Sequence, residues 1–125
     1  MKSLSVRLRI ILVAIGLSIF GYAEVWGVDW RLFFISAKGE DYFDLENVTH
    51  LSKNIVQVWT KRRYKDFSYS ITLNEINCAH KVIWFSDTTF YATDGSVRES
   101  GSPEPKWDFI IRGSSGEALY KRVCK

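Results

Sequence analysis

The sequence predicts an α+β fold that is mainly β, an antiparallel meander sheet with one short C-terminal helix tied to it by a disulfide. Runs of aromatic and β-branched residues alternate with turn-forming residues along most of the chain, which favours strands. A helical spacing of apolar residues occurs only near the C-terminus, and the chain has two cysteines, Cys78 and Cys124. Its 125 residues allow for one domain of ordinary globular composition.

Residues 1–23 have the tripartite layout of a secretory signal peptide. Three basic residues precede an apolar run, Ile10–Phe20, and the small residues Gly21 and Ala23 suit cleavage after Ala23. The run is shorter than the roughly 20 residues that span a bilayer, so we expect no membrane span after cleavage. An uncleaved anchor is the alternative. In both cases residues 24–125 form the exported domain, in the periplasm or on the outer cell surface.

The two cysteines are expected to pair, because in an oxidising compartment two cysteines pair without remainder. A bond between Cys78 and Cys124 would close a loop of 47 residues (124 − 78 + 1). The chain-entropy model gives such a loop a stabilisation of about 4 kcal/mol. A pair of buried free thiols is the alternative.

Three hairpins are predicted after the leader, because aromatic and β-branched runs are separated by turn-forming residues. The paired segments are Trp30–Ser36 with Tyr42 and Phe43, Ile55–Tyr64 with Phe67–Cys78, and Lys81–Thr93 with a strand that begins at Val97. The turns fall at residues 38–41, 65–66 and 94–95. Three consecutive hairpins make a meander.

The apolar parity changes within Phe67–Cys78. Ile71 and Leu73 share one face of the predicted strand, whereas Ile76 and Cys78 share the other. A β-bulge explains this pattern, and so does a strand that is covered on both sides.

The last segment of the chain predicts a helix. It follows a loop at residues 101–105, where two prolines cannot join a ladder. Ser114 and Glu117 have the spacing of a capping box. One face of the predicted helix carries Leu119, Tyr120, Val123 and Cys124. A helix of about ten residues is marginal alone, so we expect sheet packing and the disulfide to hold it.

Several short motifs occur in a fixed order along the domain. They are Val58-Trp59-Thr60-Lys61, Glu75-Ile76-Asn77-Cys78, Tyr91 with Asp94-Gly95-Ser96-Val97, Trp107, and Gly113-Ser114-Ser115-Gly116-Glu117-Ala118-Leu119 followed by Val123-Cys124-Lys125. Together they resemble the bacterial surface-adhesin protein E-like domain family. The similarity covers nearly all of the mature chain, and the C-terminal motif is its most specific part.

The resemblance implies a signal peptide, an antiparallel sheet with one C-terminal helix, and joined cysteines, which the residues also predict. The family is named after an adhesin that binds host matrix proteins and plasminogen and can dimerise. The resemblance therefore implies a protein or extracellular-matrix partner and allows a homodimer. Many similar sequences look like small periplasmic proteins of environmental bacteria. This chain departs from the family in having Arg112-Gly113 in place of Pro-Gly.

No catalytic, metal or cofactor site is predicted, and we expect that the protein is not an enzyme. The only histidines, His50 and His80, lie in predicted turns, and the sequence has no Cys-x-x-Cys, His-x-x-x-His or Gly-x-Ser-x-Gly motif. The acidic residues Asp41, Asp44 and Glu46 lack calcium-loop spacing. We interpret them as solvated turn charges.

Two binding features are predicted. A basic cluster interleaved with aromatic residues can bind sulfate or phosphate chains, and consists of Lys61, Arg62, Arg63 and Lys65. Its alternative interpretation is a charged hairpin tip that discourages aggregation of sheets. The C-terminal Lys125 presents an ammonium and a main-chain carboxylate, which lysine-binding pockets of plasminogen recognise, and the resemblance implies that ligand.

Net charge and tryptophan content bound the partners further. Three of the seventeen basic residues lie in the leader, so fourteen basic residues face fourteen acidic ones in the mature domain. Such a balance gives no global field for nucleic acid, and no nucleic-acid partner is expected.

Trp59, Trp84 and Trp107 are predicted in the core, whereas Trp26 and Trp30 belong either to the core or to an exposed interface.

These observations predict an exported, non-enzymatic binding module of the envelope or cell surface. The alternative is a periplasmic structural or accessory subunit whose sheet edge pairs with a partner chain.

Overall fold

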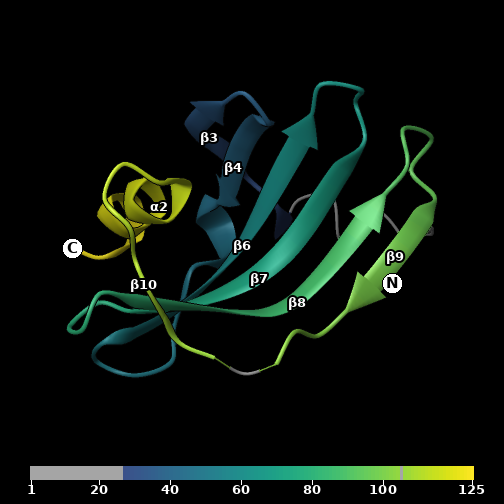
Figure 1. The fold of residues 1–125 in the computed structure, drawn as a ribbon. Helices are drawn as coiled ribbons and strands as arrows, with labels where there is room; N and C mark the ends of the chain where they lie inside the picture. Colours follow the sequence, from purple (N-terminus) through teal and green to yellow (C-terminus); the bar gives the residue numbers. More distant parts are fainter. Residues whose placement is uncertain (1–26, 105) are drawn as a thin grey trace, which may run out of the picture.

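The chain folds into one antiparallel sheet with a single helix on one side (Figure 1). A computed structural model describes residues 27–104 and 106–125, so the predicted leader with cleavage after Ala23 lies outside the described residues. The strands are β3 (Trp30–Ser36), β4 (Gly39–Asp44), β5 (Thr49–His50), β6 (Ile55–Tyr64), β7 (Tyr69–Asn77), β8 (Val82–Tyr91), β9 (Val97–Gly101) and β10 (Asp108–Phe109). A 3-10 turn, η2 (Leu45–Asn47), follows β4, and the helix is α2 (Ser115–Val123).

The predicted meander is confirmed for the long strands, and the consecutive order is interrupted only where β4 pairs with β6 and β8 pairs with β10. The order is β10-β8-β7-β6-β4-β3, with β5 also on β6 and β9 also on β8, and every pair is antiparallel. The two-residue strands β5 and β10 were not predicted. Figure 1 shows α2 near β3 and β4 and β9 at the opposite edge of the sheet.

The changing parity of β7 reflects cover on both sides of the sheet, whereas the bulge lies on the neighbouring strand β8 and β7 pairs with β6 in unbroken register. The register between β7 and β8 shifts between Leu73 and Asn74, since Leu73 faces Asp87 and Asn74 faces Phe85. Ser86 is therefore the extra residue of a bulge on the partner strand. The apolar residues of β7 also lie on both sides of the sheet.

The core lies on one side of the sheet, which we call the helix face. Five sheet residues and two helix residues form it: Phe43, Val56, Val58, Ile76, Ile83, Leu119 and Val123. Burying a side chain of this size stabilises a fold by about 1.5–3 kcal/mol. Apart from Phe43, all of these buried core residues are aliphatic.

The expectation that three tryptophans fill the core was wrong. Trp59 is 38% exposed and Trp107 is 41% exposed, and Trp84 is half-buried. Trp59 follows Val58, and Trp84 follows Ile83, in strands where successive side chains point to opposite faces. These two tryptophans therefore lie on the other side of the sheet, which we call the outer face.

The predicted helix and its cap are confirmed. The Ser114 hydroxyl accepts a hydrogen bond from the Glu117 amide at 3.3 Å. The Glu117 carboxylate accepts one from the Gly113 amide at 3.0 Å, and this bond lowers the pKa of Glu117. The disulfide between Cys78 and Cys124 joins the residue after β7 to the residue after α2. Within the described part of the chain, no helix is long and apolar enough to cross a membrane.

The cap gives a testable prediction. Ser114→Ala should lower the free energy of unfolding by about 1 kcal/mol, because the Glu117 amide loses its acceptor. Urea unfolding followed by circular dichroism measures the change. Ser115→Ala is the matched control, since the Ser115 hydroxyl has no hydrogen-bond partner among the described residues. Equal losses in the two variants would mean that the cap contributes nothing.

Candidate functional site

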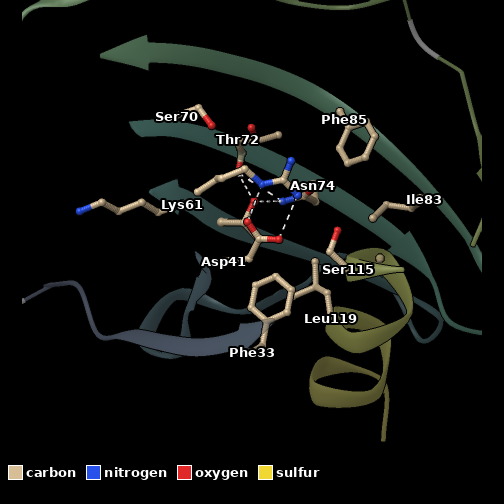
Figure 2. A pocket seen from close by; sticks show the side chains of 13 residues that line it. Phe33, Asp41, Lys61, Ser70, Thr72, Asn74, Ile83, Phe85, Ser115 and Leu119 are labelled. Carbon is tan, nitrogen blue, oxygen red and sulfur yellow. Dashed lines mark hydrogen bonds and ion pairs between the residues drawn. The ribbon is translucent and has the colours of Figure 1, made fainter. Parts of the chain in front are cut away.

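The helix covers only part of the helix face, and the remaining part is polar. The rows of side chains that contain Val58 and Ile76 in the core continue with Thr60, Arg62, Ser70, Thr72 and Asn74. These residues and Asp41 line a cavity of about 180 Å³, whose apolar walls include Phe33, Phe85 and Leu119 (Figure 2). Because every second residue of a strand faces the same side, one face of the sheet carries both sets of side chains. The apolar ones form the core at one end of the strands, and the polar ones form the cleft at the other.

An ion pair between β4 and β6 forms the charged part of the cleft. The Arg62 guanidinium donates to both carboxylate oxygens of Asp41, at 2.6 and 2.9 Å. Asp41 is only 4% exposed, whereas Arg62 is half-buried. The hydrogen bond with Asp41 raises the pKa of Arg62. Two parallel bonds hold both planar groups in one orientation.

A buried amide organises the floor of the cleft. The Asn74 amide donates to the Val58 carbonyl at 3.1 Å and to the Thr60 hydroxyl at 2.9 Å. Beside it, the hydroxyls of Thr72 and Thr88 lie 3.2 Å apart. These polar groups bond to one another and to the backbone, an arrangement that suits a rigid surface.

The expected role of the acidic residues was wrong for two of the three. Asp41 and Asp44 are buried, and only Glu46 is a solvated charge. Asp44 accepts hydrogen bonds from the amides of Asp29 and Glu46 and from the side chain of Asn47, so it fixes the turn after β4. Among the described residues, no group of three or more His, Cys, Asp or Glu side chains could hold a metal ion.

The two arginines of the basic cluster lie on opposite faces. Arg62 faces the cleft, whereas Arg63 points to the outer face and pairs with Glu40 at 2.6 Å. A hydrogen bond from Tyr42 and the bond from Arg63 both lower the pKa of Glu40. Each arginine is therefore already matched by a carboxylate.

The lysines of the cluster are separate from these pairs. Lys61 lies over two aromatic rings of the outer face, with its ammonium 4.7 Å from the Tyr69 ring centre and 5.9 Å from that of Trp30. Figure 2 shows that Lys61 points away from the cleft. Lys65 is exposed in the turn after β6, and Lys125 is exposed at the end of the chain. The structure thus does not bring the basic cluster together as one patch, and its binding role stays a prediction.

The outer face carries a surface that the sequence reasoning anticipated only for Trp30, as one of two alternatives, while Trp26 lies outside the described residues. Trp30, Trp59, Ile71 and Tyr91 line a hollow of about 470 Å³. Tyr69 stacks on Tyr91 at 4.7 Å between ring centres. The signal was present in the sequence, because these residues have the parity opposite to that of the core. The two histidines line neither hollow, and both are exposed.

The fold and its two hollows define a small, disulfide-closed α+β domain with recessed polar and aromatic surfaces. The chain belongs to the surface-adhesin protein E family, whose model matches residues 30–125. The match begins with β3 and ends at the last residue, so it includes the disulfide and nearly all of both hollows. The resemblance seen in the motifs is confirmed. Comparisons with curated proteins and with solved structures found no significant match.

Proposed function

We propose that the protein is an exported, non-enzymatic binding module with an adhesin-like role in the envelope or on the cell surface. The observation that carries the proposal is the family match, which extends over the whole sheet and the helix. The cleft supports it, since Arg62 bonds to the Asp41 carboxylate and the Asn74 amide bonds to the Thr60 hydroxyl, which leaves a shaped surface. The predicted leader supplies the route of export.

Lys125 is the group that we propose for recognition of a host protein. It is exposed and directly follows Cys124, which the disulfide fixes to the end of β7. The Lys125 ammonium is thus presented from a rigid base. We propose lysine-seeking modules such as those of plasminogen as the partner, with sulfated matrix chains bound more weakly by the exposed Lys65.

The C-terminal lysine gives a direct test. Deleting Lys125 should weaken plasminogen binding at least tenfold and should abolish the part that free lysine competes. Surface plasmon resonance with immobilised plasminogen measures both. Lys53→Ala is the control, since Lys53 is an exposed lysine in the connection before β6.

The outcomes of this experiment distinguish a wrong assignment of Lys125 from a wrong assignment of the adhesin-like role. Unchanged, lysine-sensitive binding after the deletion would exclude Lys125 as the ligand. If the intact protein binds neither plasminogen nor heparin at low salt, the adhesin-like role fails.

An accessory subunit is a second candidate, and one feature favours it. Among the described strands, β9 pairs with β8 alone, and all five of its residues are exposed. An edge of this kind offers free backbone groups to a strand of another chain. Protease treatment of intact cells distinguishes the two roles, because an adhesin at the outer surface is cleaved, whereas a periplasmic subunit is protected.

A further inference from the structure

The hollow on the outer face combines aromatic rings with polar side chains. Trp30, Trp59, Ile71 and Tyr91 form its apolar part, and Thr49 and Gln57 are among its polar residues. Trp59 is 38% exposed although its strand is central to the sheet. Exposed aromatic groups beside a few polar ones are typical of binding sites, because most large aromatic side chains are otherwise buried.

Neighbouring residues hold the rings in place. Tyr91 stacks on Tyr69 with 14° between the ring planes, and the Lys61 ammonium lies over both Tyr69 and Trp30. Rings that are ordered before a ligand arrives lose little freedom on binding. The hollow is therefore a preorganised stacking surface.

Two polar side chains of the hollow are available to a ligand. Thr49 and Gln57 face each other across the β5–β6 pair, and neither side chain has a hydrogen-bond partner among the described residues. Asp44 and Asn47, which also line the hollow, are bonded to each other. An amide and a hydroxyl thus remain to bond with hydroxyl groups of a ligand.

The charge beside the hollow is positive. Within the described residues, Lys61 has no carboxylate partner, and only aromatic rings lie against its ammonium. The one carboxylate of the hollow, on Asp44, is 3% exposed and accepts three hydrogen bonds. A ligand with a negative charge near its ring therefore complements this surface.

We propose that this hollow binds a saccharide chain that carries carboxylate groups. One sugar ring stacks its apolar face on Trp59, its hydroxyls bond to Gln57 and Thr49, and a carboxylate on the chain pairs with Lys61. The site lies on the outer face and does not involve Lys125. The proposal rests on the proposed function only in one respect, namely that the protein is a binding module.

The test uses the purified protein and a hyaluronan octasaccharide, whose charges are carboxylates. Isothermal titration and tryptophan fluorescence should show binding, and Trp59→Ala should raise the dissociation constant at least tenfold. Trp107→Ala is the matched control, because Trp107 is similarly exposed, at 41%, and does not line the hollow. It should leave the constant unchanged.

Further variants keep the proposal falsifiable. Gln57→Ala should raise the dissociation constant at least threefold even if Trp59→Ala fails to fold. Lys61→Gln should weaken hyaluronan binding and leave binding of a neutral cello-oligosaccharide unchanged. Absence of hyaluronan binding by the unmodified protein, equal affinity for the neutral chain, or equal behaviour of the two tryptophan variants would overturn the proposal.

The proposed function can fail independently. Deleting Lys125 should leave hyaluronan binding intact, and Trp59→Ala should leave lysine-competed plasminogen binding intact. If both variants lose both ligands, the two surfaces are not separate and the saccharide site is not supported.

Discussion

Replacing Cys78 and Cys124 by serine should lower the free energy of unfolding by about 4 kcal/mol. The disulfide joins residues 46 apart in sequence and connects α2 to the end of β7. Without it the unfolded chain regains the freedom of a long open loop. The helix has only nine residues, which is too short to be stable alone, so its packing should weaken as well. Urea unfolding of the double variant measures the loss.

The single variants are the control for this prediction. Cys78→Ser and Cys124→Ser should each lower the free energy of unfolding nearly as much as the double variant does, because all three variants remove the same disulfide. Intact mass after alkylation under denaturing, non-reducing conditions should show no added group, and after reduction it should show two. A loss below about 1 kcal/mol would mean that helix packing, and not chain closure, dominates.

Removing the buried carboxylate of the cleft should have the second largest effect. Asp41→Ala should cost about 3 kcal/mol, because it leaves the guanidinium of Arg62 without its partner inside the cleft. The partial exposure of Arg62 places the expected loss at the lower end for buried pairs. Thermal and urea unfolding measure it.

The neighbouring pair on the outer face supplies a matched comparison. Glu40 and Arg63 join the same two strands one residue away, but both are more exposed. Glu40→Ala should therefore lower the free energy of unfolding much less than Asp41→Ala does. Equal losses in the Asp41 and Glu40 variants would show that burial does not strengthen the dependence of Arg62 on Asp41.

The strands and the helix were predictable because their signals are local and repeated. The three long strands contain nine or ten residues each, enough for alternation to be visible. Ser114 and Glu117 marked the start of the helix through the chemistry of the cap itself. The strands β5 and β10 contain two residues each, and no period can be recognised over two positions. They form only because β6 and β8 extend beyond β4 and β9.

The candidate sites were harder to predict, because alternation separates two faces without saying which one the helix covers. Val58 and Trp59 are both apolar, and size favours the tryptophan for the core, yet the helix packs on the side of the valine. Asp41 was placed in a turn, but the turn is tighter and β4 already begins at Gly39. Because the strand begins three residues earlier than predicted, Asp41 lies within β4 and opposite Arg62.

The return of α2 to β3 has a consequence for the order of folding. The three hairpins β3–β4, β6–β7 and β8–β9 join segments that are consecutive in sequence, so these pairings form through loops that close at low entropic cost. The contact of Arg122 with the Leu32 carbonyl spans 90 residues, far more than any strand pairing of the sheet. The helix therefore docks after the strands that precede it in sequence. A chain that emerges N-terminus first can build its sheet early and complete its core only when α2 has been made.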